Sequence, residues 1–279
     1  MKKRILIAIL SIVMLVGLMP ITAFAASSDI IVGGANLGNG STTVYYKNGD
    51  TSGNLTGTAE DYNAKLGTVG GVATLTIKNL SVAAASGKAG IVSYVPLNLI
   101  LEGANSITGG DDDEWPAYGI YGYDDLTISG DGSLSVTGGD AADDDSYGIY
   151  AYGELTINGG TISATGGTAA VNSYGIYAYG ALTITDGTIS ATGGTATENS
   201  YGICAWSMPW IQGGVVNATG GTAGSENDNV SCGISGGDGV AIYGGIVNAI
   251  GGTAGLSYGI ERCYQISGGT VVATGGDAV

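Results

Sequence analysis

Two groups of side chains in this sequence could do chemistry: a regularly spaced set of aromatic residues and two runs of carboxylates. The aromatic residues recur at intervals of 27 or 29 residues in the middle of the chain. Aromatic rings can stack on the weakly apolar C–H faces of sugars, whereas stacked tyrosines can also serve only to stabilise a sheet, and both interpretations stay open. The candidate carbohydrate-binding residues are Tyr121, Tyr123, Tyr150, Tyr152, Tyr177, Tyr179 and Trp206.

The carboxylates lie in two acidic loops, residues 111–114 and 140–145, each of which follows a Gly-Gly pair. Neighbouring carboxylates repel one another unless they are protonated, solvated or bridged, and Ca²⁺ is a cation that prefers oxygen ligands. The pattern therefore indicates a calcium site between the loops, with two solvated loops as the alternative. The candidate calcium ligands are Asp111, Asp112, Asp113, Glu114, Asp140, Asp143, Asp144 and Asp145.

The composition argues against catalysis. The chain has no histidine, which excludes an imidazole base, a Ser-His-Asp triad and a histidine-bound zinc ion. A pectin-active lyase needs a basic residue beside its acids, and an inverting glycosidase needs two separated carboxyls. Asp124 and Asp125 supply a pair, but they begin a recurring strand and are expected to be structural. After residue 25 the basic residues are Lys47, Lys65, Lys78, Lys88 and Arg262. We expect a protein that is not an enzyme.

An internal repeat predicts the elements that hold these side chains. Residues 146–172 and 173–199 are near-identical copies of 27 residues, and each contains three short segments in which apolar and polar residues alternate. Three strands and three bends per repeat predict an all-β fold, a right-handed parallel β-helix solenoid of eight or nine coils. The side chains expected to point inward in the first copy are Ile149, Ala151, Leu155, Ile157, Ile162 and Ala164.

Register in such a solenoid stacks equivalent residues of adjacent coils about 4.8 Å apart. The aromatic residues should then form a stripe on the exterior, and the two acidic loops should lie side by side.

The ends of the chain differ from the repeats. Residues 1–25 have the pattern of a secretory signal peptide, so we expect a secreted or cell-surface protein with no membrane span after cleavage. Residues 26–73 are expected to cap the solenoid or to form irregular first coils, and residues 74–279 to form the repeats. The repeat pattern runs to the last residue without a polar cap, which predicts a capping partner or further C-terminal domains.

Charge restricts the partners. Without the signal segment the chain would carry five basic and 24 acidic residues, a net charge near −19, so nucleic acid is not an expected partner. Acidic polysaccharide would be repelled unless calcium lay between the two, whereas a neutral glycan would need no metal.

The repeats resemble a known family. A Leu-rich strand ends in Gly103-x-Asn105-x-Ile107, an Asp-Leu-Thr-Ile strand follows at residues 125–128, and GG-T-I-x-A coils recur after it. From residue 74 onwards this succession resembles the bacterial secreted right-handed β-helix carbohydrate-binding domain family, whose members include a calcium-associated, pectin-binding protein. The resemblance implies the fold, and carbohydrate binding with it. A structural spacer or an adhesin-like surface protein is the alternative.

Overall fold

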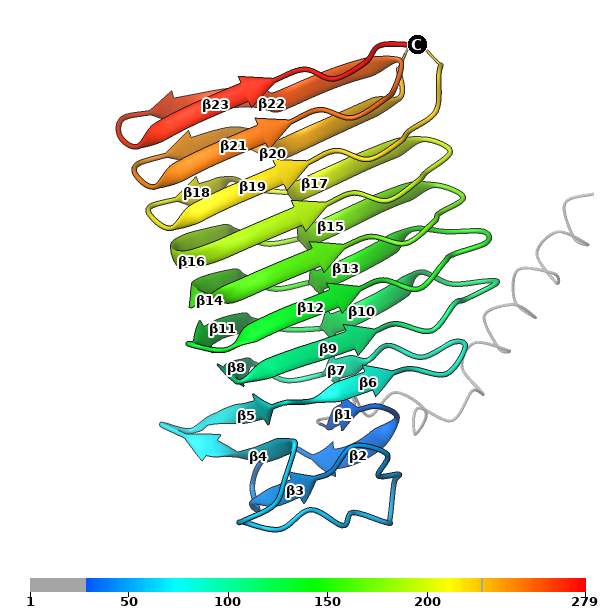
Figure 1. Cartoon of the computed structure of the whole chain (residues 1–279), viewed down its shortest axis with the longest axis vertical. Coiled ribbons are helices and arrows are strands. Elements are labelled where there is room, and N and C mark those ends of the chain that lie inside the picture. Colours follow the sequence, from blue (N-terminus) through cyan, green and yellow to red (C-terminus); the bar gives the residue numbers. More distant parts are fainter. Residues whose placement is uncertain (1–28, 227) are drawn as a thin grey trace, which may run out of the picture.

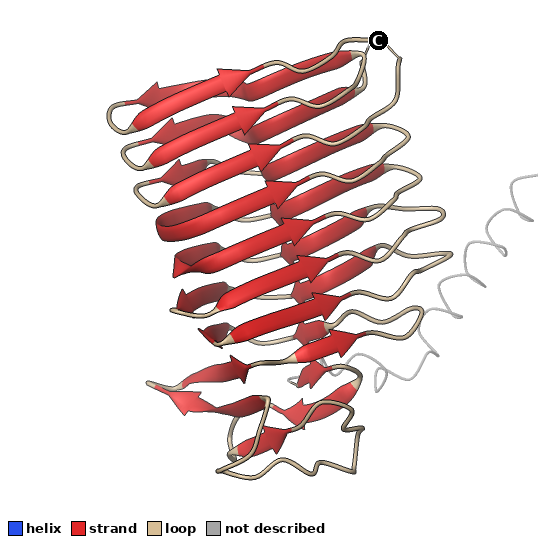
Figure 2. Cartoon of the chain, in the orientation of Figure 1, coloured by secondary structure: helices blue, strands red, loops and turns tan. Residues whose placement is uncertain are grey.

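A computed structural model describes residues 29–226 and 228–279, and all the regular elements in these residues are β-strands (Figure 2). The predicted signal peptide, residues 1–25, lies outside the described residues. Within them, no helix is long and apolar enough to span a membrane.

The chain winds into a parallel β-solenoid of about seven turns, with a right-handed course that rises from the N-terminal cap (Figure 1). Each coil contributes strands to three faces, and each strand pairs in parallel with its equivalent one coil later. The first face consists of β7 (Ile91–Ser93), β10 (Ala117–Gly122), β13 (Ser146–Ala151), β15 (Asn172–Ala178), β17 (Asn199–Ala205) and the starts of β20 (Val230–Ile242) and β22 (Leu256–Ile266).

Among the described residues, four long strands turn a corner between faces: two join the second face to the third, and two join the first face to the second. The second face consists of β5 (Val72–Lys78), β8 (Leu97–Glu102), β11 (Leu126–Gly130), the first parts of β14 (Leu155–Thr165) and β16 (Leu182–Thr192), β18 (Pro209–Ile211) and the ends of β20 and β22. The third face consists of β6 (Ser81–Ala83), β9 (Ala104–Thr108), β12 (Ser133–Thr137), the second parts of β14 and β16, β19 (Val215–Thr219), β21 (Ile246–Ile250) and β23 (Thr270–Thr274).

The predicted register is confirmed. Ile149 pairs with Ile176, and Leu155 and Ile162 pair with their counterparts 27 residues later. All six residues predicted to point inward are at most 1 % exposed. Because these side chains are apolar, their removal from water is the main force that stacks the coils.

At each Gly-Ile step of the first face, the alternation of inward and outward side chains is interrupted. Strict alternation would place Tyr147 and Ile149 on the same side of the strand. Instead Gly148 and Ile149 both face inward. A side chain at Gly148 would come within 2.6 Å of Gly175 O in the next coil and 2.9 Å of the Thr165 backbone in the same coil, so only glycine fits there. Tyr147 and Tyr150 therefore both point outward, with their ring centroids 4.9 Å apart.

The number of coils was overestimated from the sequence: about seven are formed, where eight or nine were expected. The reason is that the first described residues pair antiparallel and close the end of the solenoid rather than adding coils. β1 pairs antiparallel with β2 and β7, and β4 lies antiparallel between β3 and β5. The strands of this cap are β1 (Ile30–Val32), β2 (Ala35–Gly38), β3 (Val44–Tyr46) and β4 (Ala64–Val69).

A row of serines, most of them buried, links successive coils by hydrogen bonds. The Ser173 hydroxyl donates to Gly167 O at 2.8 Å and accepts from Gly194 N of the next coil at 2.9 Å. Equivalent pairs of bonds are made by Ser146, Ser200, Ser231 and Ser257. Each hydroxyl thus satisfies backbone groups in two coils at a corner where the strand ladder is interrupted.

Candidate functional site

The first face of the solenoid carries three stacks of aromatic side chains, one beside the other. We call them the inner, middle and outer ladders. The inner ladder consists of Tyr118, Tyr147, Tyr174 and Tyr201, the middle ladder of Tyr121, Tyr150 and Tyr177, and the outer ladder of Tyr123, Tyr152, Tyr179 and Trp206. All seven aromatic residues predicted from the sequence thus lie in the middle and outer ladders.

The outer ladder is the most exposed of the three. Its ring centroids are 5.5, 4.8 and 5.6 Å apart from Tyr123 to Trp206, and successive ring planes differ by 3° to 11°. Its members are 41–66 % exposed. The rings stack face to face along the solenoid, so between neighbours only their edges and hydroxyl groups meet solvent.

The inner ladder was missed in the sequence. Tyr147 and Tyr174 are at most 9 % exposed, and Tyr147 Oη donates to Asp145 Oδ2 at 2.7 Å. Desolvation raises the pKa of both tyrosines well above the usual value, and neighbouring charges raise it further. Simple alternation hides these residues, because it assigns Tyr147 to the same side as the buried Ile149. The available signal was the Tyr-Gly-Ile-Tyr sequence repeated at 118–121, 147–150 and 174–177.

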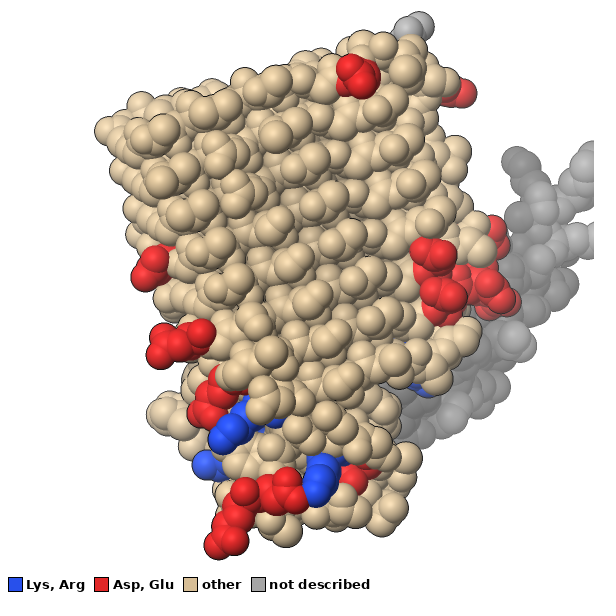
Figure 3. All heavy atoms as spheres, viewed as in Figure 1, with Lys and Arg blue, Asp and Glu red and all other residues tan. Residues whose placement is uncertain are grey.

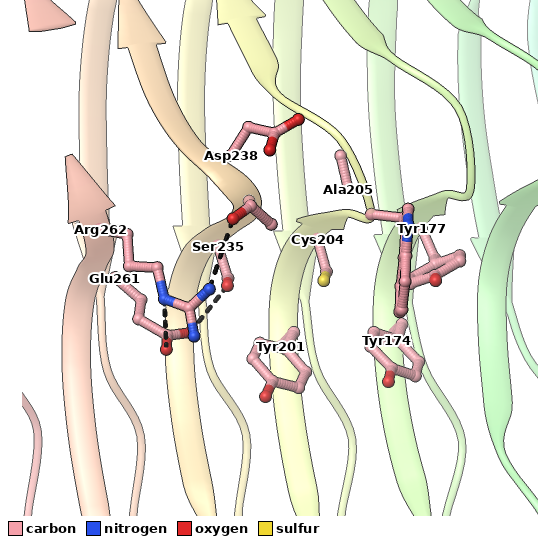
Figure 4. A pocket seen from close by; sticks show the side chains of 12 residues that line it. Tyr174, Tyr177, Tyr201, Cys204, Ala205, Ser235, Asp238, Glu261 and Arg262 are labelled. Carbon is pink, nitrogen blue, oxygen red and sulfur yellow. Dashed lines mark hydrogen bonds and ion pairs between the residues drawn. The ribbon is translucent and has the colours of Figure 1, made fainter. Parts of the chain in front are cut away.

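The ladders end in a pocket of about 540 Å³ at the coil of β17 and β20. Its lining includes the last aromatic residues, Tyr177, Tyr201 and Trp206, together with charged residues of the following coils (Figure 4). A second hollow, of about 270 Å³, lies at the opposite end of the ladders and is lined by Tyr118, Tyr121 and Trp115 among others.

The two acidic loops lie side by side, as their register predicted. Asp112 N donates to Asp140 O at 2.8 Å, and Asp140 N donates to Asp111 Oδ1 at 2.9 Å. Acidic residues form a cluster at the edge of the solenoid, while the sheet face turned to the viewer carries few charges (Figure 3).

Several carboxylate oxygens in these loops already accept hydrogen bonds from the protein. Asp112 Oδ1 accepts from the backbone of Glu114 and Trp115, and Asp145 Oδ1 accepts from both the backbone and side chain of Asn172. Within residues 29–226 and 228–279, no three acidic or cysteine side chains form a group that could hold a metal ion. This arrangement does not fit a preformed calcium cage, and calcium binding stays a prediction from the sequence.

The pair Asp124 and Asp125 has a structural role. Asp124 Oδ1 accepts from Asp125 N, and Asp125 Oδ1 accepts from Glu154 N of the next coil, both at 2.8 Å. The Asn105 side chain of the Gly-x-Asn-x-Ile motif has a comparable role, because it bonds Leu80 N of the preceding coil and Ser133 O of the following one. These motifs hold adjacent coils in register.

The reactive groups available outside the ladders are few. The three cysteines are unpaired: Cys232 is buried, Cys204 lines the pocket and Cys263 is exposed. Desolvation raises the pKa of the Cys204 and Cys232 thiols, that of Cys232 to about 12, so neither is a ready nucleophile near neutral pH.

The aromatic ladders and the pocket at their end therefore form the candidate site, with the acidic loops beside them. No family model, curated protein or solved structure matches this chain.

Proposed function

We propose that this protein is a secreted or cell-surface, non-catalytic carbohydrate-binding module, and that its first face is the glycan-binding surface. The observation that carries the proposal is the outer ladder, a continuous row of four exposed aromatic side chains on a rigid sheet. Exposed apolar surface of this kind is costly in water, which suggests that it is kept for contact with a partner.

The geometry of the ladder suits an extended polymer. Its rings repeat with every coil, so a chain lying along the solenoid axis would meet the same edges and hydroxyl groups several times. Tyrosine hydroxyls both donate and accept hydrogen bonds, as sugar hydroxyls do. Because neighbouring rings and strands fix these side chains in advance, binding would cost little conformational entropy.

The proposed function includes no reaction. The chain contains no histidine, and the paired carboxyls Asp124 and Asp125 both accept backbone hydrogen bonds, that of Asp125 from the next coil. Both observations favour a binding protein over a lyase or hydrolase.

Neutral polysaccharide is the ligand class that the charge favours. A mature chain of net charge near −19 repels polyuronates, and several carboxylates of the acidic loops, such as Asp112 and Asp145, already accept hydrogen bonds from the protein. Binding of an acidic polysaccharide would require a bridging cation such as Ca²⁺, as the sequence-based prediction has it.

A glycan array with and without a chelator tests the proposal. We expect retention of at least one neutral polysaccharide in the presence of chelator, and at least tenfold weaker binding by the double variant Tyr152→Ala, Tyr179→Ala. Tyr243→Ala is the matched control, because Tyr243 is 45 % exposed but belongs to none of the three ladders. If the wild-type protein retained no glycan, the spacer or adhesin-like function would replace this proposal.

A further inference from the structure

The three aromatic ladders stop within two successive coils, because the next residue in each stack is small. The middle ladder ends at Tyr177 in β15, and the inner and outer ladders end one coil later, at Tyr201 and Trp206. Tyr177 is followed in register by Cys204, Tyr201 by Cys232, and Trp206 by Gly237. The first two pairs are direct strand partners, and Gly237 is the next residue after the pair Ala205 and Gly236.

The end of the ladders leaves one ring face without an aromatic neighbour. Trp206 stacks on Tyr179 with a centroid distance of 5.6 Å and an interplanar angle of 11°. The next coil places Gly237 at the corresponding position, where an added Cβ would lie 2.0 Å from Trp206 O, so no side chain fits there. Among the described residues, no further ring stacks on Trp206, which is 66 % exposed.

Charged side chains form the opposite wall of the pocket (Figure 4). Glu261 Oε2 accepts from Ser235 Oγ at 2.7 Å, and Glu261 Oε1 lies 3.7 Å from Arg262 Nε. Arg262 Nη1 also donates to Gly237 O at 3.3 Å, which holds the guanidinium across the pocket. Asp238 lies on a four-residue interruption of the ladder between β20 and β22, and its carboxylate accepts from Ser207 Oγ at 3.4 Å.

This combination of walls has the features of a sugar-binding pocket. An indole face can stack on the C–H face of a pyranose, while two carboxylates and a guanidinium supply acceptors and donors for its hydroxyl groups. A volume of about 540 Å³ is within the range of small-ligand sites. The pocket has two acidic groups and one basic group, which disfavours a uronate, and the guanidinium disfavours a cationic ligand.

We propose that this pocket binds the terminal sugar of a neutral glycan, with a pyranose ring stacked on Trp206 and its hydroxyl groups bonded to Asp238, Glu261 and Arg262. The proposal rests on the carbohydrate-binding function and deepens it, because it places the strongest contact at the end of the ladders. A polymer lying along the first face would thus be held by its terminus.

Filling the pocket tests this proposal. Cys204→Tyr restores the sequence SYGIYA of the two preceding copies, so the new ring should continue the middle ladder and occupy the hollow without loss of fold. We expect this variant to weaken the binding of neutral methyl pyranosides and short neutral oligosaccharides at least tenfold, with an unchanged melting temperature. Asp238→Asn should weaken binding in the same direction, and Asp186→Asn, an exposed carboxyl outside the pocket, is its control.

Titration calorimetry with these neutral sugars, and with the matching methyl uronates, separates the outcomes. If Cys204→Tyr and Asp238→Asn bind as the wild type does while Tyr152→Ala, Tyr179→Ala loses the polysaccharide, the pocket proposal is overturned and the ladder function stands. Preference for the uronates over the neutral sugars would also overturn it. If the wild type binds neither short sugars nor polysaccharide, both proposals fail.

Discussion

Ser173 shows how much depends on single side chains in this fold. Its hydroxyl is buried and satisfies Gly167 O of its own coil and Gly194 N of the next. Ser173→Ala should lower the free energy of unfolding by about 1–3 kcal/mol, because it leaves the half-buried Gly194 amide without its acceptor and Gly167 O without its donor. Denaturant unfolding measures this change. The exposed Ser163, on the outer side of β14, provides the control, and Ser163→Ala should change the free energy by less than about 0.5 kcal/mol.

The cysteines offer a second residue-scale prediction. Desolvation is the largest cause that raises the pKa of Cys204, followed by the nearby Cys232 and Glu261, so its thiol stays protonated around pH 8. Alkylation at that pH, followed by mass spectrometry, should modify the exposed Cys263 first and leave Cys204 and Cys232 largely unmodified. Equal rates at Cys204 and Cys263 would contradict the environment described for the pocket.

The tyrosine ladders should make the folded protein less stable at alkaline pH. Desolvation raises the pKa of Tyr150 from 10.0 to about 12, and interactions with Tyr121 and other ladder residues add to this shift. A pKa raised in the folded state contributes stability below pH 10, and this contribution is lost as the pH rises towards about 12, since only the unfolded chain ionises freely in that window. The melting temperature should therefore fall steeply between pH 10 and about 12.

Circular dichroism and tyrosinate absorbance should record that fall together. The double variant Tyr150→Phe, Tyr177→Phe cannot ionise at two ladder positions and should lose less stability over the same pH interval. A wild-type protein that titrates all its tyrosines near pH 10 without unfolding would show that the ladders are open to water.

The acidic loops permit a direct test of the calcium site predicted from the sequence. Binding between the loops would raise the melting temperature in millimolar calcium by mass action, and Asp112→Ala with Asp144→Ala would abolish the rise. Sodium chloride of equal ionic strength is the control for charge screening. A melting temperature that does not respond to calcium would contradict the prediction.

The strands of the repeats could be predicted because the sequence shows both the two-residue alternation within a strand and the 27-residue repeat between coils. Alternation places Leu155, Ile157 and Ile162 inward, and the 27-residue spacing places each above its counterpart. The inner ladder could not be found this way, since Gly148 and Ile149 both face inward and break the alternation. The close approach of backbone to Gly148 that requires a glycine is visible only in the folded coil.

The rest of the candidate site could not be predicted from the sequence, because it is formed by contacts between coils. The pocket is lined by two small residues, Cys204 and Gly237, that take ladder positions. That these two positions adjoin is visible only once the register between coils of different loop length is known. The antiparallel cap has no repeat at all, so the sequence predicts only a cap or irregular first coils there and not the pairing of its strands. Register alone predicted that the acidic loops lie side by side. It did not predict that their carboxylate oxygens accept hydrogen bonds from backbone amides.

At the scale of the whole molecule, protection from solvent should vary along the axis. β16 is paired on both sides, with β14 before it and β18 and β19 after it, whereas β23 pairs only with β21 and its Val272 is 51 % exposed. Amide hydrogen exchange should be slow in β16 and β14 and much faster in β23. A capping partner or further coils would slow exchange in β23, and uniform protection of the isolated protein would contradict this gradient.

The serine row joins each coil only to its two neighbours, and this gives the molecule an unusual response to mechanical load. When the two ends of the solenoid are pulled apart along the axis, the outermost coil bears the force on its interstrand bonds before any other coil does. Detachment should therefore proceed one coil at a time, each releasing about 27 residues, as the step from Ser146 to Ser173 indicates. At roughly 3.3–3.6 Å per residue, optical tweezers should record a regular staircase of about 90 Å increments in contour length.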